Sequence, residues 1–210
     1  MDGMKRRLAS AAALFALFAG FPALAQTPAD LTLFERFARK TEKNPALGKM
    51  AEAPPAGLDK AKWMAGTWDV TSRRYATPTL PERVQKGTRR TTFEMKGWWL
   101  LSVDDIGDLK AASLITEDPF SQKWARVFLS SWGGGLARPM ISSSGFQEEG
   151  IAFEGAIVLF GEPVDVRLRI SKADDDHYFE VWEESLPGNR VVPVFEVQAV
   201  RRKAVPAKAK

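Results

Sequence analysis

The feature that most constrains the fold of this chain is an alternation of apolar and polar residues with a period of two. Between Val164 and Ser171, two valines, a leucine and an isoleucine occupy every second position, and an aspartate, two arginines and a serine stand between them. Successive side chains of a β-strand point to opposite faces of the sheet. A segment of this kind therefore predicts an antiparallel sheet with one face against a core and one face in water.

Short runs rich in Val, Ile, Thr, Phe and Trp recur from Leu58 onward, separated by turn-forming breaks such as Asp104-Asp105 with Gly107-Asp108, Asp118-Pro119 and Pro187-Gly188. Regularly spaced short strands with turn signals are typical of all-β sandwiches and barrels. The sequence predicts about ten strands, at residues 64–75, 88–96, 98–105, 110–117, 122–132, 136–145, 150–160, 163–172, 177–186 and 190–201.

Consecutive antiparallel strands joined by hairpins close most simply into an up-and-down barrel, which leaves no exposed sheet edge. The predicted fold class is therefore all-β, a barrel of about ten antiparallel strands over residues 58–202, with one N-terminal helix. A two-sheet sandwich is the alternative. A barrel of about eight or more strands can hold one small ligand in its interior, provided that side chains do not fill it.

The N-terminal helix is expected over residues 28–43. Thr27 and Asp30 have the spacing of a capping box, and Asn44-Pro45 is expected to end the helix. A Pro-rich connector follows, up to Gly57. The helix either packs against the barrel or covers its mouth.

The first 25 residues have the pattern of a bacterial-type secretory signal peptide. Lys5-Arg6-Arg7 precedes an apolar stretch over 8–21, and Ala23-Leu24-Ala25 provides small residues for cleavage after Ala25. The apolar stretch is shorter than the roughly 20 residues of a spanning helix, although an uncleaved anchor is the alternative. We expect a periplasmic or secreted protein with no stable membrane insertion after cleavage.

The net charge of +4 comes from the two ends of the chain, because residues 26–200 carry 22 basic and 25 acidic residues. A nucleic-acid-binding surface needs a basic face on the folded body, so no nucleic-acid partner is expected. Residues 203–210 are expected to form a basic disordered tail. The oligomeric state stays open.

The chain has no cysteine, and its one histidine is His177. Disulfides, thiolate metal sites, thiol catalysis and sites with several histidines are therefore excluded. The run Asp174 to Asp176 is expected to be a solvated turn rather than a calcium loop. Gly133 to Gly135 is expected to be a hairpin rather than a phosphate loop. No metal or cofactor is predicted.

Four short motifs carry a resemblance to a known superfamily. They are Gly66-Thr67-Trp68, residues 118–124, residues 151–155 and residues 174–180. Together they resemble the calycins, which include lipocalins, fatty-acid-binding proteins and nitrobindins, and in particular a secreted calycin-like group catalogued as a domain of unknown function. The resemblance implies a ten-stranded barrel with a small-molecule cavity, in which Trp68 closes one end beneath a short helical turn. It implies no reaction.

Alternation also identifies candidate ligand-binding residues. Arg126 shares one strand face with aromatic residues, and its planar guanidinium would suit a ligand carboxylate or phosphate in an apolar cavity. Alternatively, the aromatic residues fill the barrel, and Arg126 extends outward or pairs with a carboxylate. The candidates are Trp68, Trp124, Arg126, Phe128, Trp132, Tyr178 and Trp182.

The sequence thus predicts an exported, non-enzymatic protein that binds a small apolar or amphipathic molecule. One alternative is a haem protein that uses His177, because nitrobindin-type relatives bind haem through a late histidine. Another is an enzyme that uses paired carboxylates among Glu180, Glu183 and Glu184. The third is an envelope interaction module with a fully packed barrel.

Overall fold

The structure, a computed structural model, describes residues 32–50, 52–131, 139–159, 161–188 and 190–203. The chain has two compact units, divided between Leu47 and Gly48. The predicted signal peptide, the Gly133 to Gly135 hairpin and all of the predicted tail except Lys203 lie outside the described residues.

The N-terminal unit contains the helix α2, Leu33–Lys43, which is followed by the short helix α3, Pro45–Met50, at the division between the units. Thr32 is the N-cap of α2 and forms a capping box with Glu35. The described helix therefore begins at Leu33 rather than at residue 28, because Thr32 has an acidic residue three positions later. Thr27, the predicted N-cap, lies outside the described residues. The helix ends at Asn44 as predicted, but Pro45 begins α3, since proline is well suited to a first helical position.

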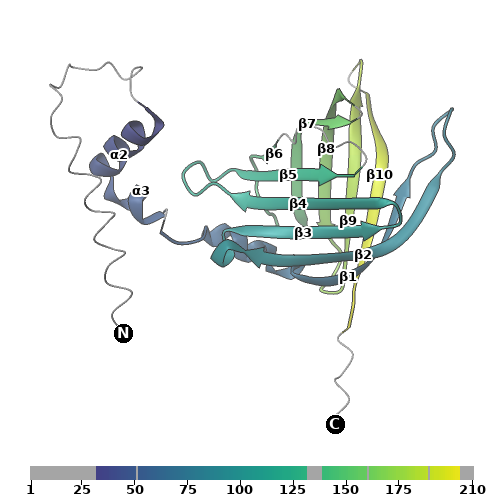
Figure 1. The fold of residues 1–210 in the computed structure, drawn as a ribbon, viewed down its shortest axis with the longest axis horizontal. Helices are drawn as coiled ribbons and strands as arrows, with labels where there is room; N and C mark the ends of the chain where they lie inside the picture. The colour runs from purple at the N-terminus through teal and green to yellow at the C-terminus, as the bar shows by residue number, and fades with distance from the viewer. Residues whose placement is uncertain (1–31, 51, 132–138, 160, 189, 204–210) are drawn as a thin grey trace, which may run out of the picture. The chain divides into compact units, whose positions relative to one another are not determined.

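The second unit is a closed barrel of ten strands, in which every neighbouring pair is antiparallel and the order around the barrel follows the sequence. The predicted fold class is confirmed. Figure 1 shows β3, β4 and β5 crossing the direction of β8, β9 and β10. The strands are β1 Gly66–Arg74, β2 Arg83–Glu94, β3 Trp99–Ile106, β4 Leu109–Glu117, β5 Trp124–Ser130, β6 Met140–Ser142, β7 Gly150–Leu159, β8 Glu162–Lys172, β9 His177–Leu186 and β10 Arg190–Arg201.

The alternation of β8 is realised in the barrel wall. Val166, Leu168 and Ile170 are buried, while Arg167 and Arg169 between them are exposed. The same pattern on the other strands fills part of the barrel with apolar side chains, which provides most of the favourable free energy of folding.

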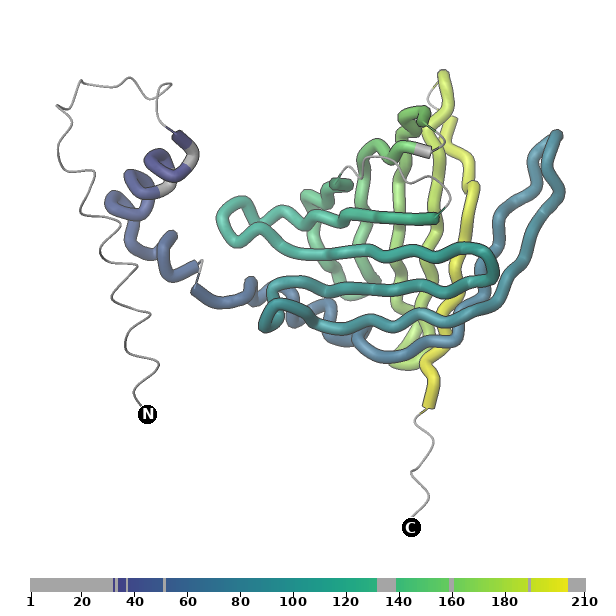
Figure 2. The backbone as a smooth tube through the Cα atoms, viewed as in Figure 1, coloured from purple at the N-terminus to yellow at the C-terminus, as the bar shows by residue number. Residues whose placement is uncertain are grey.

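Most predicted strand boundaries lie within about two residues of the observed ones, and β2 and β6 differ most. β2 begins at Arg83 rather than at 88, and its hairpin with β1 extends away from the barrel wall (Figure 2). β6 is limited to Met140–Ser142, and only Ile141 pairs with β7, opposite Glu154. In the predicted break at Asp104-Asp105 with Gly107-Asp108, Gly107 and Asp108 form the turn as predicted, whereas Asp104 and Asp105 lie within β3.

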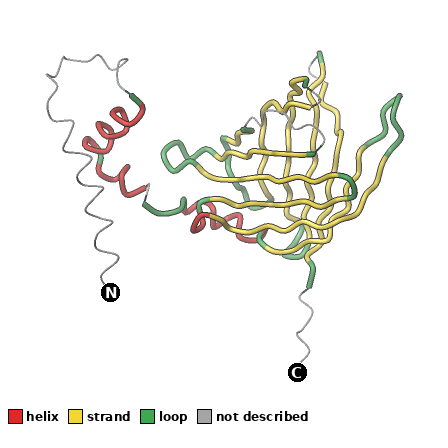
Figure 3. Tube along the Cα trace, in the orientation of Figure 1, coloured by secondary structure: helices red, strands yellow, loops and turns green. Residues whose placement is uncertain are grey.

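A short 3-10 helix, η3 over Ala56–Met64, precedes β1 (Figure 3). It occupies part of the predicted Pro-rich connector. Its buried residues Leu58, Ala61 and Met64 belong to the same core as the barrel side chains. The helices in the described part of the chain include none that is both long and apolar enough to span a membrane.

Candidate functional site

The barrel encloses a cavity of about 530 Å³. Small-molecule sites in proteins commonly measure about 300–1,000 Å³ and have mainly apolar walls with a few polar groups. The walls of this cavity are also mainly apolar and carry a few polar groups. Their apolar side chains include Phe128, Ile157, Val164, Val166, Trp182 and Phe195, which come from strands β5, β7, β8, β9 and β10.

The rim of the cavity includes the long hairpin between β1 and β2. Leu80 near its tip, together with Arg74 and Arg83 at its base, lines the cavity. Arg74 Nη2 donates to the carbonyl oxygen of Pro81 at 2.9 Å. Arg83 Nη1 lies 3.1 Å from a carboxylate oxygen of Asp108, which also lines the cavity. The chain thus contributes both apolar and charged groups to the rim.

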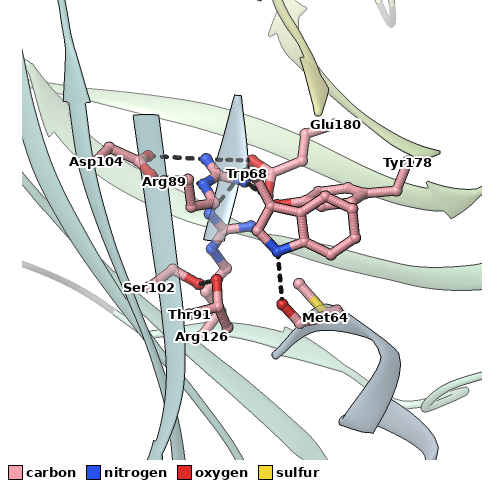
Figure 4. A network of polar contacts seen from close by, with 9 residues as sticks. All are labelled: Met64, Trp68, Arg89, Thr91, Ser102, Asp104, Arg126, Tyr178 and Glu180. Atoms are coloured by element: carbon pink, nitrogen blue, oxygen red, sulfur yellow. Dashed lines mark hydrogen bonds and ion pairs between the residues drawn. The ribbon is translucent and has the colours of Figure 1, made fainter. Parts of the chain in front are cut away.

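A buried polar cluster lies deeper in the barrel, centred on Arg89 of β2 (Figure 4). Arg89 donates from Nε to Asp104 Oδ1 at 2.5 Å and from Nη2 to Asp104 Oδ2 at 2.8 Å. Its Nη1 donates to the Tyr178 hydroxyl at 2.9 Å and to Glu180. Since Arg89, Asp104 and Glu180 also line the cavity, this cluster forms its charged floor.

Strand register explains why these side chains meet. Arg89 and Asp104 are directly opposite each other on β2 and β3. Tyr178 and Glu180 are two residues apart on β9, so both point into the barrel. The floor is thus built by strands that are far apart in the sequence.

Burial and the neighbouring arginines determine the protonation states of Glu180 and Tyr178 in the floor. Burial alone would raise the pKa of Glu180, but the guanidinium groups of Arg126 and Arg89 outweigh this effect, and the pKa lies below its ordinary value. Burial raises the pKa of Tyr178 to about 12, against the opposing effect of Arg89. At neutral pH the floor therefore contains an ionised Glu180 and a neutral Tyr178.

Arg126 of β5 points into the barrel and is only 1% exposed. Its Nη2 lies 3.5 Å from Glu180 Oε2, and its guanidinium carbon lies 5.4 Å from the centre of the Trp182 ring. Its Nε and Nη1 have no hydrogen-bond partner among the described residues. The alternative in which Arg126 extends outward is wrong, whereas its pairing with a carboxylate is confirmed.

The opposite end of the barrel interior is packed. Trp68 Nε1 donates to the carbonyl oxygen of Met64 at 2.9 Å, and the Trp68 ring lies 4.7 Å from that of Tyr178. Arg201 places its guanidinium carbon 4.1 Å from the centre of the Trp68 ring and donates to the carbonyl oxygens of Ala65 and Trp63. Trp68 therefore closes this end beneath η3.

The candidate residues from the sequence divide between the two halves of the barrel. Phe128 and Trp182 line the cavity, with ring centres 5.0 Å apart. Arg126 and Tyr178 belong to the cluster at the floor. The others are Trp68 and Trp124, which are buried without lining the cavity, and Trp132, which lies outside the described residues.

Sequence reasoning missed Arg89 and Asp104. Asp104 follows Leu100 and Ser102 at every second position, so the alternation that identified the other inward residues was also present here. The pair of aspartates was instead interpreted as a turn. Arg89 lies on a strand whose other residues are mostly polar, and no apolar alternation marks its face.

His177 lies at the exposed start of β9, where its Nδ1 is 2.8 Å from Asp174 Oδ1. It does not line the cavity. The neighbouring Asp175 pairs with Lys172 at 2.7 Å, so residues 174–176 form a salt-bridged surface turn. Among the residues that the structure describes, no group of three or more His, Cys, Asp or Glu residues is placed to hold a metal ion.

A scan of protein-family models found no family that matches this chain, and a search of curated proteins found no matching relative.

Proposed function

We propose that this chain is an exported, non-enzymatic protein that binds a small apolar or amphipathic molecule inside its barrel, as its resemblance to the calycins implies. The observation that carries the proposal is the cavity of about 530 Å³, with apolar walls and a charged floor. Burial of apolar ligand surface contributes about 25 cal/mol per Å². The walls would supply most of the affinity, and the polar floor and rim would orient the ligand.

The distribution of side chains supports binding rather than complete packing. Aromatic residues such as Trp63, Trp68 and Trp124 fill one end of the barrel, where their rings contact Tyr178 or Phe146. At the other end, Val164 and Ile157, which are opposite each other on β8 and β7, face open space. A chain selected only for a stable barrel would gain by filling that space, since unfilled apolar volume destabilises a core.

Titration of the full chain with Nile red, a neutral fluorescent apolar probe, tests the proposal. The unmodified protein should bind the probe saturably. The substitution Val164→Trp should reduce its affinity at least tenfold, because the indole would occupy the cavity. Val200→Trp is the matched control, since Val200 is 45% exposed on the outer face of β10, and it should leave the affinity unchanged.

The proposal is wrong if the probe does not bind, or if the two tryptophan variants bind it equally well. Circular dichroism and urea unfolding of both variants would show that each retains the fold.

A further inference from the structure

The charges that line the cavity are unequally divided. Among the described residues they comprise three arginines and four carboxylates, which are Arg74, Arg83, Arg89, Asp104, Asp108, Glu180 and Glu184. Arg126 pairs with Glu180 and brings a fourth positive charge, so the net charge does not decide which head group the cavity prefers. The pairing of the individual groups decides it.

Arg89 has no donor left for a ligand. A guanidinium carries five N–H groups, and Arg89 makes five hydrogen bonds, two to Asp104, two to Glu180 and one to Tyr178. A ligand carboxylate could reach Arg89 only by displacing Asp104 or Glu180. Breaking a buried ion pair of this kind is costly, because it leaves a charge uncompensated.

Glu184 is in the opposite situation. It is half-buried, lines the cavity and has no hydrogen bond or ion pair with any other described residue. It follows Trp182 by two positions on β9, so both side chains face the cavity. The ring of Trp182 packs against that of Phe128. A carboxylate without a partner attracts a cation through charge, whereas the Trp182 ring already has the Arg126 guanidinium 5.4 Å from its centre.

We infer that the cavity selects an amphiphile with a cationic head group, whose ammonium contacts Glu184 while its apolar chain lies against the valines and aromatic residues of the walls. This inference rests on the proposed function, because it names the class of ligand for the same cavity. It replaces the expectation that Arg126 anchors an anion. Arg126 belongs to the buried cluster through Glu180 but is not among the residues that line the cavity.

Arg74 is the one lining arginine whose charge is not paired with a carboxylate among the described residues. Its Nε is buried without a partner. It lies on β1, which is separated from β9 and Glu184 by β10. Adjacent strands are about 4.8 Å apart, so Arg74 and Glu184 are distinct positions on the rim that can be tested separately.

The test compares three probes with the same ten-carbon chain, decylamine, decanol and decanoate, by calorimetric titration of the full chain at pH 7. At this pH the amine is protonated and the acid is ionised, since such groups have ordinary pKa values of about 10 and about 4. Decylamine should bind about tenfold more tightly than decanol, as expected for one charge-assisted contact, and decanoate should bind most weakly.

The variant Glu184→Gln should reduce the affinity for decylamine to that for decanol and leave decanol unchanged. Glu183→Gln is the matched control, because Glu183 pairs with Arg169 rather than lining the cavity, and it should change neither affinity. The inference is overturned if Glu184→Gln leaves decylamine binding unchanged. It is also overturned if decanoate binds most tightly, and loss of that binding in Arg74→Gln would then place the anion at Arg74.

A different result would count against the proposed function itself. If none of the three probes binds, and Nile red does not bind either, the cavity is not a ligand site and the inference fails with it. If decanol and Nile red bind but decylamine has no advantage over decanol, the cavity binds ligands and only the cationic preference is wrong.

Discussion

Arg89 and Glu180 are the two residues on which the interior of the barrel depends most. Arg89 is 2% exposed and Glu180 is 1% exposed. Each would be strongly unfavourable in a core without its partners. The floor contains Arg89 and Arg126 against Asp104 and Glu180, so the charges balance only while all four are present.

The substitution Glu180→Gln should lower the free energy of unfolding by about 3–5 kcal/mol at pH 7, because it removes one partner of a buried ion pair. The folded-state pKa of Glu180 lies below its ordinary value of 4.5. Its contribution to stability is therefore fully present above this value and is lost as the pH falls through the lower folded-state pKa. The difference between the unmodified protein and the variant should be constant from pH 7 to about pH 5 and shrink below it.

Urea unfolding at a series of pH values measures this difference. The control is Asp165→Asn, a substitution at an exposed residue on the outer face of β8, which should change stability by no more than about 0.5 kcal/mol. A difference for Glu180→Gln that stays constant down to pH 3 would show that the carboxylate charge is not what stabilises the cluster.

The two buried arginines should differ in their importance. Arg89→Met removes the ion-pair partner of Asp104 and leaves Glu180 with only the 3.5 Å contact from Arg126. We therefore expect the free energy of unfolding to fall by about 3–5 kcal/mol. Arg126→Met removes a guanidinium whose Nε and Nη1 have no described partner, so its cost should be smaller. Thermal unfolding of both variants ranks them. A larger loss for Arg126→Met would mean that Arg126 makes contacts beyond those described.

At the scale of the elements, close strand pairing at Gly150 is a requirement of the fold. Gly150 begins β7 with a φ of +139°, and a Cβ there would overlap the carbonyl oxygen of Ile170 on β8. Gly161, in the turn between β7 and β8, also has a positive φ of +88°, but a Cβ there would meet nothing within 4 Å.

Gly150→Ala should therefore destabilise the barrel by more than Gly161→Ala. The second variant carries only the backbone cost of about 1–3 kcal/mol, whereas the first also requires the two strands to separate. Urea unfolding of the two single variants compares them directly. Equal losses would indicate that β7 shifts at Gly150 without cost.

The elements also show what could be predicted from the sequence. The alternation from Val164 to Ser171 predicted β8 because each inward residue is apolar and each outward residue is polar. The same reasoning was wrong at Asp104, because a carboxylate that faces inward opposite Arg89 looks like a turn residue until the register of β2 and β3 is known. Register depends on long-range pairing, which the local pattern does not contain.

Long-range contacts also explain the other differences between the predicted and the observed elements. β6 was predicted over 136–145, but within the described residues it covers Met140–Ser142 and pairs with β7 only at Ile141, a long-range pairing that the local pattern does not contain. Phe128 and Trp182 were identified as inward residues from alternation alone. Alternation places Trp68 and Trp124 inside as well, and the calycin resemblance implied that Trp68 closes one end of the barrel. The contact of Arg201 with the Trp68 ring was not predicted, because Arg201 is distant in the sequence.

The interior of the whole barrel consists of a packed half and a hollow half, with the Arg89 cluster between them. Leu100, Ile115 and Leu168 are fully buried without lining the cavity, whereas Ile157, Val164 and Val166 line it. A guest molecule should therefore contact the second set of side chains and not the first. This division follows from the placement of η3, Trp68 and Arg201 at one end of the barrel.

The most direct test of the central claim is an NMR measurement of intermolecular nuclear Overhauser effects between decanol and the methyl groups of the full chain. We expect contacts from the decanol chain to the methyl groups of Ile157, Val164 and Val166, and none to those of Leu100, Ile115 or Leu168. Saturable binding with contacts only to outward-facing methyl groups, such as those of Val200 and Ile141, would contradict that claim.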